Sequence, residues 1–201
     1  MRSTFAMVML LLACGTAAAA QDAGAPGAWS AGTPVVLFDG RSLDRWTATR
    51  FAERSRIARD SLPKVVDGAM RVTARDAWTH TVDIFRSFRL TLNYRLPDGA
   101  ATLYFRAWPR LDDLGRPVNA SLFDLPALDD RWHVIQVECR DGHAQISLDG
   151  AVIAETDDVK NSAGHIGVRA HEGAIEIREV TLTPLRAADR SLPGLPAPPG
   201  W

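Results

Sequence analysis

The feature that most constrains the fold is a repeated alternation of apolar and polar residues with a period of two. It is clear in the runs Phe88–Tyr94, Trp132–Val137, Ala144–Leu148 and Ala174–Leu182. Because successive side chains of a β-strand point to opposite faces, this period predicts strands with one buried face. The only helical candidate is the charged segment 51–60, FAERSRIARD. The chain is therefore predicted to be all-β.

Asp-Gly pairs separate the apolar runs. They occur at Asp39-Gly40, Asp67-Gly68, Asp98-Gly99, Asp141-Gly142 and Asp149-Gly150. Glycine supplies the positive φ that tight hairpin turns require, and aspartate tolerates it. The best-defined case is 136–156, QVECRDGHAQISLDGAVIAET, which predicts an antiparallel meander of three strands. Many short strands joined in this way indicate a jelly-roll sandwich of two antiparallel sheets.

The length of 201 residues, 46% of them hydrophobic, fits one domain with one core. We assign this jelly-roll domain to residues 34–186. The segment 21–33, QDAGAPGAWSAGT, is small and polar and is predicted to be a flexible linker. Residues 187–201 are predicted to form a proline-rich, extended tail.

Residues 1–20 have the pattern of a signal peptide. Arg2 precedes an apolar run, and Ala18 to Ala20 supply the small side chains of a cleavage site. The run is shorter than the roughly 20 residues that span a bilayer. We therefore expect a secreted or periplasmic protein. The alternative is a lipoprotein, because Leu11 to Cys14 resembles a bacterial lipobox, and lipidation of Cys14 would then be the route to a membrane.

Charge and cysteine content narrow the class of partner. The chain has 23 basic and 24 acidic side chains and a formal net charge of −1, so electrostatics favours neither nucleic acid nor an anionic membrane surface. Cys139 is alone once the leader is removed, and its place in an alternating run predicts a core hydrophobe. The acidic pairs lack the alternating ligand spacing of a calcium loop. We expect no metal and no cofactor.

Taken in order, the motifs suggest a family. LFDG-x-SLD-x-W at 37–46 is followed by a VVDG turn, a W-x-V-x-Q-V strand, an LDG turn and a closing G-x-IGV-x-x-HEG-x-IEIREV. This order resembles the 3-keto-disaccharide hydrolase domain, which is related to laminarin-degrading glycosidases and concanavalin A-like lectins. The resemblance spans residues 35–185. Its matching positions include Trp46, Arg106, Trp132, Gly164, Gly167, His171, Gly173 and Arg178.

The resemblance implies a concanavalin A-like jelly roll that hydrolyses glycosidic bonds of sugars oxidised at the 3-hydroxyl. Its implied ligand is a carbohydrate, either an oligosaccharide or a keto-sugar. Several polar positions depart from the family. An Asn-Ser-Gly run is replaced by 99–102, an aspartate by Ser87 and a glutamine by Arg169, and the central insertion is reduced to a loop at 109–130.

The candidate chemistry follows from the substrate class. Glycosidases ordinarily use two carboxyl groups in one cleft. Glu176 and Glu179 have an odd spacing that sends them to opposite faces of a strand. A 3-keto sugar needs only one base and a positive partner, because the ketone acidifies the C2 proton. Alternation directs Arg169 and His171 to one face, about 7 Å apart. We therefore predict His171 as the base and Arg169 as its electrophilic partner.

Four further residues are candidates for substrate binding. His80 and Trp78 share a strand face, and the indole would stack on a pyranose. Arg106 ends a strand where the family keeps an arginine, and Asp44 lies on the loop before Trp46. Trp46 itself is predicted to fasten that corner to the core. The alternative to an enzyme is a lectin-like module of the bacterial envelope that binds glycans without cleaving them.

Overall fold

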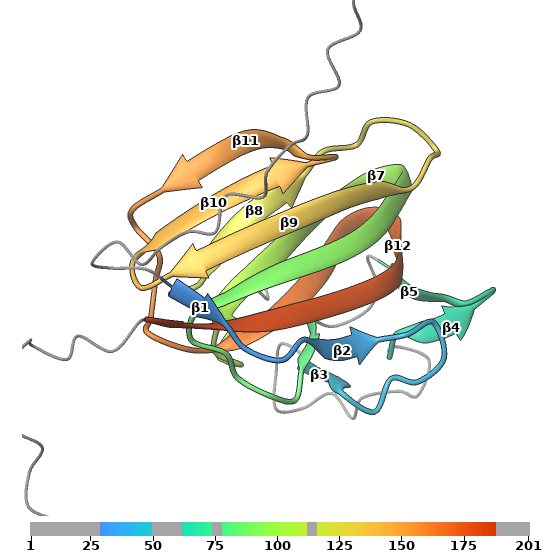
Figure 1. Ribbon diagram of the computed structural model, residues 1–201. Coiled ribbons are helices and arrows are strands. Elements are labelled where there is room, and N and C mark those ends of the chain that lie inside the picture. The colour runs from blue at the N-terminus through green and yellow to red at the C-terminus, as the bar shows by residue number, and fades with distance from the viewer. Residues whose placement is uncertain (1–28, 50–61, 74–77, 112–115, 188–201) are drawn as a thin grey trace, which may run out of the picture.

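The computed structural model describes residues 29–49, 62–73, 78–111 and 116–187 (Figure 1). All the elements in these ranges are β-strands, and every pairing between them is antiparallel. The predicted leader and the helical candidate 51–60 lie outside the described residues, as do most of the linker and the tail. Within the described ranges no helix is long and apolar enough to cross a membrane.

Two long strands, β7 (Phe88–Ala107) and β12 (His165–Ala187), organise the molecule. They pair with each other along almost their whole length, from Phe88 opposite Pro184 to Ala107 opposite His165. Both strands curve round at the same side of the molecule in Figure 1. Each therefore contributes one half to each of two layers, and the hydrogen-bonded network is continuous from one layer to the other.

The first layer contains the first half of β7 and the second half of β12. On the β7 side it continues through β9 (His133–Arg140), β10 (His143–Leu148) and β11 (Ala151–Thr156). The other edge of β12 pairs with three separate strands, which are β1 (Trp29–Ala31), β2 (Val35–Phe38) and β5 (Ala69–Thr73). Strand β4 (Lys64–Val66) pairs with β5.

The second layer contains the second half of β7 and the first half of β12. Strand β8 (Ser121–Leu125) lies beside β7, β6 (Trp78–Thr81) lies beside β12, and β3 (Trp46–Thr49) pairs with β6. The order is therefore β8-β7-β12-β6-β3. The two layers confirm the predicted jelly-roll sandwich.

The core fills the space between the layers. Leu90 and Leu92 of the first layer and Leu103 and Val168 of the second belong to one cluster of fully buried side chains. Leu90 and Leu92 alternate with exposed or half-buried residues, as the period of two predicts, whereas Leu103 lies in the run 101–107, which is buried on both faces. Cys139 lies in this cluster as a free thiol, and burial raises its pKa to about 11. It is the core hydrophobe that the sequence predicted.

The meander predicted at 136–156 is formed by β9, β10 and β11, with turns at Asp141 and Asp149 that both have positive φ. The predicted role of Trp46 is also confirmed, because its indole N–H donates to the Leu37 carbonyl at 2.9 Å. Asp39 accepts the backbone N–H of Arg41 at 2.9 Å, as expected of a turn residue.

Three expectations need correction. Residues 29–31, placed in the linker, form β1 against the end of β12, because a free strand edge is available there. The central loop at 109–130 contains strand β8. Asp98-Gly99 is not a hairpin turn, since it lies inside β7 where the strand passes from one layer to the other.

The bend of the long pair depends on two facing glycines. Gly99 has φ +93° and Gly173 has φ +59°, and the two are directly opposite in the ladder. A Cβ at Gly99 would lie 2.1 Å from the Glu172 carbonyl oxygen. A side chain at this point would push the two backbones apart, so only glycine permits both the conformation and the close approach.

We predict that Gly99→Ala lowers the free energy of unfolding by more than about 2 kcal/mol, because strain at positive φ adds to a backbone clash. Gly150→Ala is the matched control. Gly150 has φ +87° with no atom near its absent Cβ, so it should lose only about 1 kcal/mol. Urea unfolding of the three proteins measures the difference. Equal losses in the two variants would contradict the role of the close approach.

Candidate functional site

The candidate site lies on the outer face of the second layer, which is the side turned away from the core. Asp124 on β8, Thr102 on β7 and Arg169 on β12 are directly opposite one another across the three strands. Directly opposite residues of an antiparallel sheet point to the same face. The three side chains therefore form one polar row across the layer.

His171 joins this row through a β-bulge. The pairing of β12 with β7 changes register between Ala170 and Glu172, which leaves His171 as the extra residue. Its Nε2 lies 2.7 Å from Thr102 Oγ1, and Thr102 Oγ1 lies 2.5 Å from Asp124 Oδ1. Bulges commonly re-aim a side chain beside a functional site. This one directs the imidazole toward the row from an exposed position.

The surroundings of His171 favour the neutral imidazole. Partial burial is the main cause that lowers its pKa from the ordinary value of 6.5, and the positive charge of Arg169 is the second. Arg116 acts in the same direction, while the carboxylates of Asp124 and Glu172 act against it. The predicted pair therefore lies in one site, with an exposed imidazole that is held in its basic form.

His80 and Trp78 lie on the same face, one row further along. Gly167 is opposite both His80 and Tyr104, and a Cβ on Gly167 would lie 2.4 Å from the Trp78 Nε1. The indole covers this glycine and stacks on the His80 ring, with centroids 4.2 Å apart. Neighbouring rows of one sheet face therefore hold all four residues that we predicted for base, partner and stacking.

The expected role of Trp78 as a sugar platform is nevertheless wrong. Trp78 is 1% exposed and His80 is 4% exposed, and the indole belongs to a small buried cluster with Tyr104 and Ala107. Nε2 of His80 faces Thr49 Oγ1 at 2.9 Å, and burial lowers the pKa of His80. Both side chains are therefore buried in the floor of the outer face.

Arg106 does not join this polar row, and its expected role in substrate binding stays a prediction. Its φ of +51° and a shift in register at the end of β7 turn its side chain away from the row. The guanidinium donates to the carbonyls of Arg86 at 2.7 Å, Asn161 at 3.1 Å and Asp141. It is 2% exposed. Arg106 therefore connects three loops of the sandwich.

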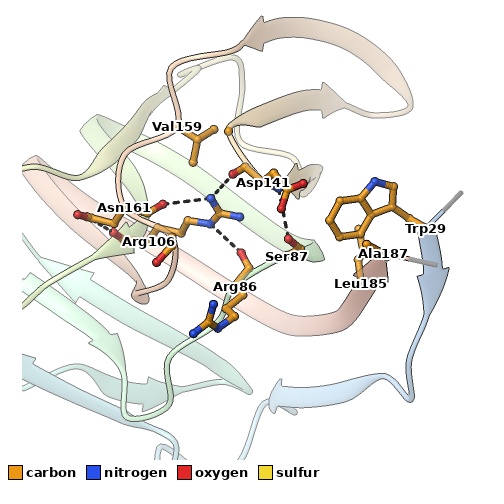
Figure 2. A pocket seen from close by; sticks show the side chains of 11 residues that line it. Trp29, Arg86, Ser87, Arg106, Asp141, Val159, Asn161, Leu185 and Ala187 are labelled. Carbon is orange, nitrogen blue, oxygen red and sulfur yellow. Dashed lines mark hydrogen bonds between the residues drawn. The ribbon is translucent and has the colours of Figure 1, made fainter. Parts of the chain in front are cut away.

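These loops line a cavity of about 510 Å³ at another place on the molecule (Figure 2). Arg106 is part of its wall, together with Trp29, Arg86, Asp141 and Leu185, whereas Arg169 and His171 are not. Asp44 also lies elsewhere. It is exposed on the loop before β3, where it lines a smaller hollow of about 240 Å³ beside Asp39. The expected binding role of Asp44 thus finds no support from the position of the other candidates.

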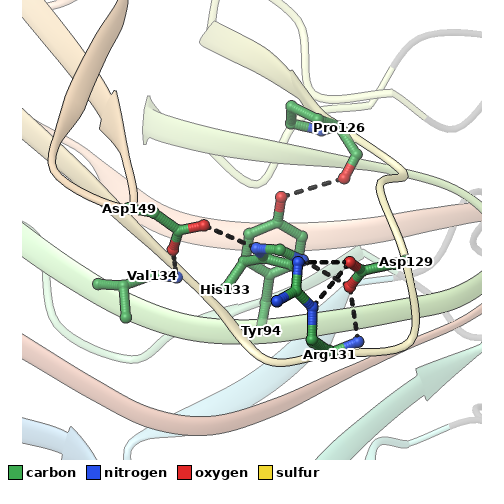
Figure 3. A network of polar contacts seen from close by, with 7 residues as sticks. All are labelled: Tyr94, Pro126, Asp129, Arg131, His133, Val134 and Asp149. Atoms are coloured by element: carbon green, nitrogen blue, oxygen red, sulfur yellow. Dashed lines mark hydrogen bonds and ion pairs between the residues drawn. The ribbon is translucent and has the colours of Figure 1, made fainter.

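A separate polar network surrounds His133 (Figure 3). Its Nδ1 lies 2.7 Å from Asp149 Oδ2, and its Nε2 lies 3.0 Å from Asp129 Oδ1. Arg131 also binds Asp129, at 2.8 Å. The network joins the segment before β9 to the turn between β10 and β11. The network therefore connects two parts of the fold.

The sequence did not single out Thr102 or Asp124. Thr102 enters the sequence analysis only within 99–102, where the family has an Asn-Ser-Gly run, and Asp124 lies in the segment that we expect to be a loop. Apolar residues on both sides of Asp124, Phe123 and Leu125, are the signal that could have placed it on a strand. Among the described residues, no group of three His, Cys, Asp or Glu side chains is arranged to hold a metal ion.

Comparison with known proteins supports the family resemblance. Residues 33–123 match the model of the 3-keto-alpha-glucoside-1,2-lyase-like domain. The resemblance to this family is therefore confirmed for that part of the chain, which contains Thr102. The other three residues of the polar row lie after the matched segment; they are Asp124, Arg169 and His171. No curated protein matches the sequence.

Solved structures confirm the fold. A putative glycosyl hydrolase from Parabacteroides distasonis has 12% identity and a TM-score of 0.59, with 74% of this chain and 92% of that chain covered. A Bacillus subtilis protein of unknown function with a galectin-like fold has 13% identity and a TM-score of 0.54, with 79% of this chain and 99% of that chain covered. A LamA variant from Z. galactanivorans, in complex with laminaritriose and laminaritetraose, has 11% identity and a TM-score of 0.50, with 77% of this chain and 98% of that chain covered.

We predict that the His133 network stabilises the fold most strongly in mildly acidic solution. The hydrogen bond with Asp149 is the main cause that raises the pKa of His133 above 6.5, and Asp129 adds to it. The stabilisation is fully present below pH 6.5 and is lost as the pH rises through the raised pKa. The urea midpoint of the wild-type protein should be lower at pH 8.5 than at pH 6.

The same fall should be smaller in His133→Gln. The matched control is His143→Gln, which removes an imidazole that also contacts an aspartate, Asp157. This variant should keep the wild-type dependence of the urea midpoint on pH. A wild-type slope in His133→Gln would contradict this assignment.

Proposed function

We propose that this protein is an exported carbohydrate-active enzyme that cleaves the glycosidic bond of 3-keto sugars, with His171 as base and Arg169 as electrophilic partner. The family match over residues 33–123 supports the substrate class. The observation that carries the assignment is the exposed imidazole of His171, which lies in the polar row beside the Arg169 charge. The predicted leader at 1–20 supports export.

The reaction begins at C2 of the sugar, where the neighbouring C3 ketone makes the proton acidic. His171 removes this proton, and the electrons move toward the ketone oxygen to form an enolate. The guanidinium of Arg169 stabilises the negative charge that develops on that oxygen. The C1–O bond then breaks, and the departing alcohol takes a proton. Addition of water across the resulting double bond gives the free 3-keto sugar.

One base and one cation are sufficient for this route, which fits the composition of the site. Glu176 does not supply a free carboxylate, because it forms an ion pair with Arg95. Asp124 accepts the Thr102 hydroxyl. A neutral His171 near pH 7 is the protonation state that a base requires.

The second candidate function is glycan binding without cleavage by a lectin-like module of the envelope. It is favoured by the loss of the Asn-Ser-Gly run at 99–102 and by the shortened central segment at 109–130. Saturable binding in a calorimetric titration, without release of sugar from any keto-glycoside, would support this function instead of the enzyme.

We predict that the purified protein releases sugar from 3-keto-trehalose or from 3-keto-glucosides. His171→Ala should lower kcat/KM by at least about 100-fold, the usual contribution of a general base. His143→Ala is the matched control, because it removes an exposed histidine of β10 and should keep wild-type activity. Sugar release followed by chromatography measures all three proteins. Equal activity in His171→Ala and the wild type would exclude His171 as the base.

The pH dependence gives a further prediction. The lowered pKa of His171 means that kcat/KM should stay constant near pH 7 and fall only below pH 6.5. Arg169→Gln removes a positive charge that lowers this pKa, so the midpoint of the fall should move to higher pH as the rate drops. Profiles of kcat/KM between pH 4.5 and 8 test this. A midpoint that is the same in both proteins would show that Arg169 does not act on the base.

A further inference from the structure

We infer that Thr102 and Asp124 are positioning residues that hold His171 with its proton on Nε2, so that Nδ1 is the atom that accepts the substrate proton. This inference rests on the proposed function for its catalytic consequence. The assignment of the proton itself follows from the hydrogen bonds of the free protein.

The direction of the hydrogen bonds identifies the tautomer. A carboxylate can only accept, so the 2.5 Å contact between Asp124 Oδ1 and Thr102 uses the single hydroxyl hydrogen of the threonine. Thr102 Oγ1 can then only accept from His171 Nε2, which lies 2.7 Å away. Nε2 must therefore carry the proton. In a neutral imidazole the other ring nitrogen, Nδ1, keeps its lone pair.

Nδ1 is available to a substrate. Within the part of the chain that the structure describes, His171 makes one hydrogen bond, and it uses Nε2. The residue is exposed to solvent, whereas Thr102 is 2% exposed. The imidazole is thus fastened on its buried side and open on the other.

The anchor is rigid for two reasons. Thr102 lies on β7 with a paired strand on each side, Asp124 of β8 and Arg169 of β12 being its direct neighbours. As a β-branched residue it also has restricted rotation about χ1. A base on a bulge would otherwise rotate freely, and Thr102 restricts that rotation to one orientation.

The first test measures the tautomer in the free protein. Long-range proton–nitrogen NMR spectra of the ¹⁵N-labelled full chain are recorded at pH 8, and the His171 signals are assigned by their loss in His171→Ala. Wild-type protein should show a protonated Nε2 and an unprotonated Nδ1. In Thr102→Val and Asp124→Ala the two nitrogen shifts should move toward each other, because the tautomers then exchange. A protonated Nδ1 in the wild type, or unchanged shifts in Thr102→Val, would overturn the inference.

The second test measures the catalytic consequence. Thr102→Val is nearly isosteric and should lower kcat by about 10- to 100-fold, the cost of a misplaced catalytic group, with little change in KM. Thr102→Ser keeps the hydroxyl and should retain most of the activity. Circular dichroism and urea midpoints establish that each variant is folded. Wild-type kcat in Thr102→Val, or no recovery in Thr102→Ser, would contradict the positioning role.

The two tests separate this inference from the proposed function. The predicted tautomer without turnover of any 3-keto glycoside would reject the function and keep the orientation of His171. Turnover that depends on His171, but with the proton on Nδ1, would keep the function and reject the roles of Thr102 and Asp124.

Discussion

The pairing of β7 with β12 is the interaction on which the rest of the structure depends. It runs from one layer of the sandwich into the other, so a single hydrogen-bonded ladder fixes how the layers lie. The ladder bends where Gly99 and Gly173 face each other at positive φ. Every other described strand is connected to one of these two long strands, either directly or through the strands between them. Loss of the close approach at the bend would therefore alter the whole sandwich.

The same pair of strands carries the candidate site. Regular alternation along β12 directs Arg169 to the outer face, and the bulge at residue 171 brings the imidazole to Thr102 of β7. At the other end of the pair, an irregularity in β7 has the opposite effect. There the positive φ of Arg106 removes its guanidinium from the face and buries it among loop carbonyls. Local departures from the ladder thus decide which polar side chain meets the solvent.

Much of the fold could be predicted, because alternation and turn chemistry are local. Asp-Gly turns identified the meander at 136–156, and the placement of Cys139 in an alternating run identified a core thiol. The prediction failed at Asp98-Gly99, where the same dipeptide allows a bend within a strand. An Asp-Gly pair indicates only that the backbone can adopt a positive φ at that point. Whether the chain reverses there depends on which strand lies opposite.

For the site, the sequence by itself determined that Arg169 and His171 lie two residues apart on a predicted strand, a spacing that favours a common face. Only the tertiary structure decided that Thr102 and Asp124 complete the row, because these residues come from two other strands that pairing brings together. It also decided that Trp78 and Arg106 are buried. Burial depends on what packs against a side chain, and those neighbours are distant in the chain.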